Sequence, residues 1–150
     1  DAMPEQSLRT LGDFEAQGLS NTPWAYATLG CRPAPLMAAI AAQALRTIGS
    51  FGAQNLSNLA WACANLSCQD LPLLNALSAS AVPTCAQFSQ QDLANTAWSY
   101  AVMSVAAAPL LQAIASAAIP TIPEFSSQGL ATTAWAFACL EIRDVPLFDA

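Results

Sequence analysis

The sequence predicts an all-α fold, a right-handed α-solenoid of antiparallel helix-turn-helix hairpins with a 37-residue period. Five residue types recur in one register over four copies, which chance does not explain. Each copy also contains two segments whose apolar residues have helical spacing. We number the repeat from its phenylalanine, so that tryptophan is position 11 and proline is position 22.

The recurring residues define the predicted core of the repeat. Phenylalanine, leucine and tryptophan occupy positions 1, 6 and 11 in every copy. The predicted core residues are Phe14, Leu19, Trp24, Phe51, Leu56, Trp61, Phe88, Leu93, Trp98, Phe125, Leu130 and Trp135. We expect the tryptophans to fill the seam between hairpins. The alternative is an exposed platform on which nucleic-acid bases stack.

The phase of the repeat predicts a single array over residues 1–150. Its parts are the tail of a preceding repeat (1–13), three full repeats (14–50, 51–87 and 88–124) and a partial repeat (125–150). Solenoids need terminal repeats with a polar outer face, and neither end carries one. We therefore expect a longer array or a partner that covers the ends.

The first helix of each repeat is expected from about position 3 to position 17, with positions 6, 10, 13, 14 and 17 facing inward. In the third repeat these inward residues are Leu93, Ala97, Tyr100, Ala101 and Ser104. Ser89 and Ser126 stand where an N-cap belongs. Glu15 and Gly52 occupy that position in the other copies, so we expect the cap to vary.

The second helix of each repeat is expected to begin near the shared proline, which a first helical turn tolerates. Asp70 and Asp144 are the expected N-caps. Pro83 and Pro120 end this helix in two copies, because proline cannot continue a helix interior. Gly49 is the expected stop in the first full copy.

A neutral polar stripe occupies positions 4, 8, 12 and 15 of the first helix. Its candidate ligand-facing residues are Gln17, Asn21, Thr28, Gln54, Asn58, Asn65, Gln91, Asn95, Val102, Gln128, Thr132 and Cys139. One interpretation is a ladder in which the amides bind the backbone of the adjacent repeat. The other is a line of amide contacts to a ligand on the concave surface. Position 15 differs in every copy, as expected for a specificity position and equally for drift.

The composition is 55% apolar and only 9% charged, against about 25% charged in a typical soluble domain. Such a surface favours contact with another macromolecule, although alanines packed between hairpins also raise the apolar count. The uncharged stretch between Asp92 and Glu124 could cross a bilayer of about 30 Å. We exclude a membrane span because this stretch contains three prolines and aligns with its polar-flanked sister repeats.

Catalytic, metal and cofactor sites are not expected, nor is a small-molecule substrate. The chain has no histidine, the most common general acid or base, and no nucleophile-elbow, phosphate-loop or zinc-protease motif. Its cysteines lack metal-ligand spacing: Cys31, Cys63, Cys68, Cys85 and Cys139. We expect small buried or half-buried thiols in a reducing compartment, and a protein that is not an enzyme.

The pattern F-x-x-Q-x-L-[SA]-N-T-x-W-A-[YF]-A-x-L, followed by P-L-[LM], resembles the octotricopeptide and heptatricopeptide repeats. The resemblance covers essentially the whole chain. It implies an α-solenoid, soluble or peripherally attached, that acts in chloroplasts or mitochondria. These families are usually assigned to organellar RNA binding, in RNA processing, RNA stability or translation. No base-reading residues are carried over from them.

Two functions follow, and the charge decides which we prefer. The first is a non-enzymatic scaffold that docks on protein subunits of a large organellar assembly, either a photosynthetic complex or a ribosome-like ribonucleoprotein. The second is an organellar RNA-binding repeat protein. RNA affinity comes largely from Lys and Arg, yet four arginines face ten carboxylates here and no lysine is present. We therefore prefer protein partners and keep RNA as the alternative.

Overall fold

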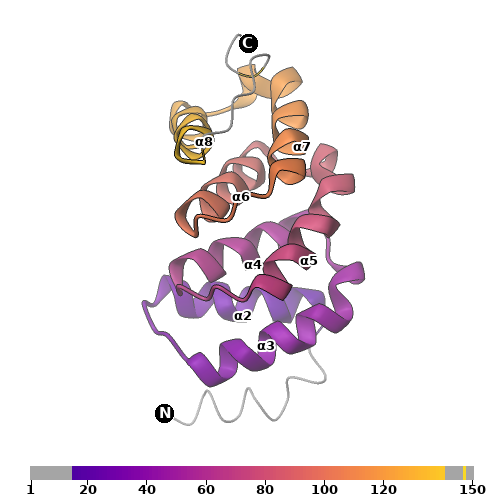
Figure 1. Ribbon diagram of the computed structural model, residues 1–150, viewed down its shortest axis with the longest axis vertical. Coiled ribbons are helices and arrows are strands. Elements are labelled where there is room, and N and C mark those ends of the chain that lie inside the picture. Colours follow the sequence, from indigo (N-terminus) through magenta and orange to yellow (C-terminus); the bar gives the residue numbers. More distant parts are fainter. Residues whose placement is uncertain (1–14, 141–146, 148–150) are drawn as a thin grey trace.

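The computed structural model describes residues 15–140 and residue 147, and it is all-helical over this part of the chain (Figure 1). The predicted all-α class is confirmed. The first helices of successive repeats are α2 (Ala16–Thr28), α4 (Ala53–Asn65), α6 (Gln90–Val102) and α8 (Ser127–Cys139). The second helices are α3 (Ala34–Thr47), α5 (Leu71–Ala81) and α7 (Ala108–Ala118). Phe14, Asp144 and the predicted tail at 1–13 lie outside the described residues.

The helices form two layers that run along the long axis of the molecule (Figure 1). The first layer, which we call the A layer, contains α2, α4, α6 and α8, each in contact with the next. Each A-layer helix begins 37 residues after the one before it. The second layer contains α3, α5 and α7, which contact one another less closely.

Each A-layer helix that precedes a described turn ends at position 15, two residues earlier than expected. Position 17 instead has a left-handed backbone, with φ of 71° at Gly30, 54° at Ser67 and 55° at Ser104. In the first copy the Gly30 N–H donates to Ala27 O at 3.1 Å and the Cys31 N–H donates to Tyr26 O at 3.0 Å. This pair of bonds is a Schellman motif, which satisfies the last carbonyls of the helix.

The left-handed turn also changes which residue faces inward. Ser104, expected on the inner face, is exposed, whereas Met103 beside it is buried. The wheel used for the expectation assumes helical geometry up to position 17, and that geometry ends earlier. Met103 therefore takes the inward place that the sequence assigned to Ser104.

The expected N-caps form where the sequence offers an acceptor. The Asp92 N–H donates to Ser89 Oγ at 3.1 Å, and the Leu73 N–H donates to Asp70 Oδ1 at 3.0 Å. Ser126 likewise accepts from the Gly129 N–H at 3.0 Å. Gly52 and Glu15 provide no side-chain cap, in agreement with the expected variation.

Proline sets the length of the second-layer helices. Helices α5 and α7 end two residues before Pro83 and Pro120, and the chain continues as the 3-10 segments η3 (Val82–Gln87) and η4 (Ile119–Glu124). Arg46 stands at the same repeat position in the first copy, and α3 runs on to Thr47.

Gly49 does not end α3. It lies two residues after Thr47, the last residue of α3, inside the 3-10 segment η2 (Ile48–Ser50), and it does not adopt a left-handed φ. The expectation that Gly49 is the stop was therefore wrong.

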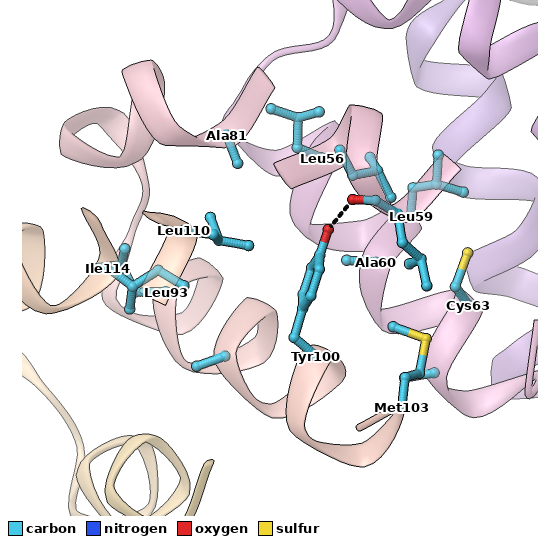
Figure 2. Packing of buried hydrophobic residues seen from close by; sticks show 14 of the residues in the cluster. Leu56, Leu59, Ala60, Cys63, Ala81, Leu93, Tyr100, Met103, Leu110 and Ile114 are labelled. Atoms are coloured by element: carbon cyan, nitrogen blue, oxygen red, sulfur yellow. Dashed lines mark hydrogen bonds between the residues drawn. The ribbon is translucent and has the colours of Figure 1, made fainter. Parts of the chain in front are cut away.

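The core lies between the two layers and is made mainly of leucine, isoleucine and alanine. Tyr100 points from α6 into this core, beside Leu59, Ala60 and Cys63 of α4 (Figure 2). It is 1% exposed, and its hydroxyl donates to the Leu74 carbonyl of α5 (the dashed line in Figure 2). Burial raises the pKa of Tyr100 well above its ordinary value. The neutral Tyr100 hydroxyl thus donates a hydrogen bond from one hairpin to the hairpin before it.

One of the expected core phenylalanines and leucines, Leu130, differs from the rest. Phe51, Phe88 and Phe125 are buried, as are the leucines at position 6 in α2, α4 and α6. Leu130 of α8 is instead 39% exposed, because it lines an apolar cavity of about 330 Å³ with Phe125 and Leu147. The residues that follow α8 along the repeat, 141–146, lie outside the described part of the chain.

We expect Tyr100→Phe to lower the free energy of unfolding by about 1–2 kcal/mol, because a buried carbonyl loses its hydroxyl donor. Urea unfolding followed by circular dichroism measures this. Tyr26 is the matched control, since it holds the same position 13 in α2. Its buried hydroxyl has no hydrogen-bond partner in the described part of the chain, so Tyr26→Phe should leave stability unchanged or raise it. Equal losses in both variants would contradict this assignment.

Candidate macromolecule-binding face

Positions 4, 8, 11 and 15 of each A-layer helix lie on one face, because their spacings of four, three and four residues follow the helical period. We call this surface the amide–tryptophan face. Its members are Gln17, Asn21, Trp24 and Thr28 in α2, Gln54, Asn58, Trp61 and Asn65 in α4, Gln91, Asn95, Trp98 and Val102 in α6, and Gln128, Thr132, Trp135 and Cys139 in α8.

Position 12 does not belong to this face, although the sequence placed it there. Ala62, Ser99 and Ala136 at this position are fully buried, at 0% exposure. Position 12 lies one residue beyond the tryptophan and so turns about 100° away from it, to the side of the helix that carries position 5 and faces the preceding A-layer helix. Ala25 of α2, which has no described helix on that side, is exposed. Tryptophan at position 11 replaces position 12 on the surface.

The amides of the face are accessible. The four glutamines at position 4 are exposed, as is Asn21, while Asn58, Asn95 and Thr132 are half-buried. At position 15 three residues are exposed and Asn65 is half-buried. The polar members at position 15 bond locally: Asn65 Nδ2 donates to the Trp61 carbonyl at 2.9 Å and Thr28 Oγ1 donates to the Trp24 carbonyl at 2.9 Å.

The tryptophans match the expectation that they fill the seam between hairpins only in part, because those of the end helices α2 and α8 are exposed while Trp98 packs against the core. Trp24 and Trp135 are 44% and 48% exposed, and Trp61 and Trp98 are half-buried. The ring centroids of Trp24 and Trp61 lie 6.3 Å apart with the planes tilted by 39°. This distance is typical of an interacting aromatic pair. Two stacked repeats therefore present a joined indole surface.

Small residues fill the seam in place of tryptophan. Positions 7 and 10 point toward the neighbouring A-layer helix, and Ser20, Ser57, Ala60 and Ala97 at these positions are buried. Short side chains let the helices approach closely, which leaves no room for an indole between them. The tryptophans are displaced to the rim of the contact.

The predicted amide ladder is not present at positions 4 and 8 of the described residues. Within the described residues, the side chains of the position-4 glutamines and of Asn21, Asn58 and Asn95 have no hydrogen bond. The bonds between A-layer helices come from positions 5 and 7. Asn55 Nδ2 donates to Ser20 Oγ at 3.0 Å, and Ser57 Oγ donates to the Asp92 carbonyl at 3.4 Å.

The amides on the face are thus free for a ligand, while the bonds between A-layer helices are made at positions 5 and 7. Sequence reasoning missed position 5 because its residue changes from copy to copy: Gly18, Asn55, Asp92 and Gly129. The available signal was its geometry, since position 5 lies one helical step from position 4 and beside the neighbouring helix.

We expect Asn55→Ala to lower the free energy of unfolding by about 1–2 kcal/mol, because Asn55 also accepts from the Gly52 N–H at 3.1 Å. Asn58→Ala should change stability by less than about 0.5 kcal/mol, since it removes no hydrogen bond. Thermal and urea unfolding of the two variants measures the difference. A larger loss of stability in Asn58→Ala than in Asn55→Ala would instead assign the bonds between repeats to position 8.

Two grooves lie at equivalent places along the face. One, of about 400 Å³, separates α6 from α8 and is lined by Gln91, Asn95, Gln128 and Thr132, with Glu124 at its margin. The other, also about 400 Å³, lies between α2 and α4 and is lined by residues that include Glu15, Gln17 and Asn55. Each groove therefore combines amides of the face with one carboxylate.

The cysteines are more varied than expected. Cys63 and Cys85 are buried and Cys68 is half-buried, but Cys31 and Cys139 are exposed. Cys31 lies in the turn after α2, and Cys139 is the last residue of α8, on the amide–tryptophan face. Both side chains therefore meet solvent. The expectation of buried or half-buried thiols was therefore wrong for these two.

Cys63 and Cys68 form a thiol pair that the sequence did not predict. The Schellman turn between them brings the Cys68 N–H to the Cys63 carbonyl at 2.9 Å and places their side chains together. A hydrogen bond from the Cys63 thiol lowers the pKa of Cys68 to about 7, while the same bond and burial raise the pKa of Cys63. Cys68 also lines a cavity of about 230 Å³ with Arg32 and Asp70.

We expect iodoacetamide to alkylate Cys68 with a half-maximal rate near pH 7, because its thiolate is held by the Cys63 thiol. Cys63→Ala should return the midpoint toward about 8.5, the ordinary value for cysteine. Mass spectrometry of the digested protein identifies the alkylated residue, and exposed Cys31 serves as the internal reference. If the pH midpoint of Cys68 alkylation does not move in Cys63→Ala, the Cys63–Cys68 pairing is wrong.

No helix of the described residues is both long and apolar enough to traverse a lipid bilayer. Over the same residues, no three or more histidine, cysteine, aspartate or glutamate side chains are grouped as a metal ion would need.

One family of known proteins matches this chain. A family model described as RNA-editing substrate-binding complex 6 protein matches residues 4–150. No curated protein matches the sequence. The matched region includes all four A-layer helices and therefore the whole amide–tryptophan face.

Proposed function

Since the chain belongs to the RNA-editing substrate-binding complex 6 protein family, we propose that it is a non-enzymatic scaffold that docks protein subunits of an RNA-editing assembly. The observation that carries this proposal is the amide–tryptophan face. It repeats along α2, α4, α6 and α8, it is accessible, and it contains no charged side chain. A neutral surface with aromatic residues is typical of contacts between proteins.

We also propose that the two layers belong to a right-handed α-solenoid with the repeat boundaries at 14–50, 51–87, 88–124 and 125–150. The common 37-residue step of the A-layer helices supports it. So does the similarity of the repeat motif to octotricopeptide and heptatricopeptide repeats. Solenoids present long surfaces to their partners, which suits a scaffold.

We place the protein in an organelle. The repeat motif resembles those of organellar families, and the family to which the chain belongs is named for RNA editing. This name favours an RNA-editing assembly over the photosynthetic or ribosome-like assemblies that the motif suggested. The cysteine content alone favours a reducing compartment.

The absence of histidine from the sequence supports a non-enzymatic role. The carboxylates of α5 and α6 are already used: Asp70 and Asp92 bond backbone N–H groups at helix starts. Glu124 accepts from Gln90 Nε2 at 2.7 Å. These groups act in the structure rather than as paired acids and bases.

RNA binding is the second candidate. Exposed Trp24 and Trp135, and the pairing of Trp24 with Trp61, offer surfaces on which bases can stack. The family name also includes a substrate-binding complex for RNA editing. The charge weighs against this candidate, because four arginines and ten carboxylates give a net charge of −6.

Affinity purification of the tagged full chain from its own cells, with and without RNase, separates the two candidates. For a scaffold, the same protein subunits remain bound after RNase. For an RNA binder, they are lost, and the purified chain binds single-stranded RNA with an affinity that falls steeply as salt increases. Loss of every protein partner on RNase treatment would overturn the scaffold.

A further inference from the structure

The free amides of the amide–tryptophan face have the hydrogen-bonding capacity of a peptide group. Each side chain amide has two N–H donors and one carbonyl acceptor. Gln91 and Gln128 hold these groups exposed, and Asn95 stands beside them in the groove between α6 and α8. An extended polypeptide presents N–H and C=O groups alternately along its length, so one amide can bind both.

The grooves carry negative charge and no positive charge. Glu15, at repeat position 2, lies in the groove between α2 and α4, and Glu124, at repeat position 37, lines the groove between α6 and α8. Among the described residues, no arginine lines either groove. A ligand that crosses both grooves therefore meets one carboxylate in each and finds no cation to neutralise a phosphate.

The tryptophans complete the site. Trp24 and Trp135 are largely exposed, and the Trp24–Trp61 pair gives an indole surface between two repeats. Indole faces bind the stems and charged heads of arginine and lysine through apolar and cation–π contact. Tryptophans that can stack bases can therefore also bind cationic side chains. The negative charge of the grooves favours cationic side chains over the bases of RNA.

The spacing of the repeat fits an extended chain. Packed helices lie about 8–10 Å apart, and a polyproline II segment advances about 3.1 Å per residue with three residues per turn. Three residues of such a segment thus span about one repeat. Every third side chain would meet an equivalent position of the face.

We propose that the amide–tryptophan face binds an extended, basic segment of a partner protein, with a lysine or arginine at about every third residue. The amides bind its backbone, the tryptophans bind the stems of its basic side chains, and Glu15 and Glu124 bind their charges. This inference rests on the proposed scaffold function and names the chemistry of the partner. RNA is the other outcome of the test below.

The test is the fluorescence anisotropy of a labelled peptide of about twelve residues in the polyproline II form, titrated with the full chain. Its sequence has arginine at every third position, with alanine and proline between. A second peptide replaces each arginine by glutamate. A single-stranded oligouridine of about the same length is the third probe. The arginine peptide should bind at least about tenfold more tightly than either of the others.

Variants assign the binding to the face. The double substitution Glu15→Gln with Glu124→Gln should weaken binding of the arginine peptide about three- to tenfold. The same variant should strengthen any binding of oligouridine, so the two ligands are separated by the sign of the effect. Circular dichroism melting checks that the fold is kept, because Glu15 is exposed and caps no helix but Glu124 accepts a hydrogen bond from Gln90.

A further set of variants tests whether binding depends on the tryptophans themselves or on any exposed apolar side chain. Trp24→Ala and Trp135→Ala should each weaken binding about three- to tenfold. Leu71→Ala is the matched control, because Leu71 is 56% exposed but lies in α5, outside the face. An equal effect of Leu71→Ala would overturn the assignment to the face.

Each outcome separates this inference from the scaffold proposal. Equal binding of the arginine and glutamate peptides, or no binding of either, overturns the basic segment even if RNase-resistant subunits still co-purify. Tighter binding of oligouridine than of the arginine peptide overturns it in favour of RNA. If the arginine peptide binds but every subunit is lost with RNase, the face binds peptide and the scaffold proposal fails.

Discussion

Close contact between A-layer helices is the constraint on which the rest of the molecule depends. Buried serine and alanine at positions 7 and 10 bring α2, α4, α6 and α8 together. Larger side chains are therefore forced either into the space between the layers or out to the rim. Leucine at position 6 and the residue at position 13 go inward, and the indole goes outward. The amide–tryptophan face therefore results from the close packing of the A-layer helices that carry it.

The sequence predicted the helices well, because helix formation depends on local spacing. The Pro-Leu pair, the serine caps and Asp70 each act within one turn, and all behaved as expected. Burial of individual side chains was harder to predict. A tryptophan that recurs in register is as compatible with a core plug as with a surface row, and only the size of its buried neighbours decides between them. Ala60 and Ala97 decided it.

The roles of the polar residues in the candidate site were also harder to predict than the helices. Recurrence drew attention to glutamine and asparagine at positions 4 and 8, yet the described side-chain bonds between A-layer helices are made by Asn55 and Ser57. Residues that bond within the array only need to suit their immediate neighbours, so they can differ from copy to copy. The residues that recur without an internal partner are those on the accessible surface. Repetition therefore marks the face, and the structure separates it from the packing that supports it.

The left-handed residue at position 17 has a consequence for how the array opens. A non-glycine residue in this conformation costs about 1–2 kcal/mol, and Ser67 and Ser104 carry that cost where Gly30 does not. The turns after α4 and α6 are thus intrinsically weaker than the turn after α2. Amide hydrogens in those turns should exchange with solvent through smaller local fluctuations. Among the described turns, compliance is then greatest after α4 and α6, where a long partner would need the face to adjust its curvature.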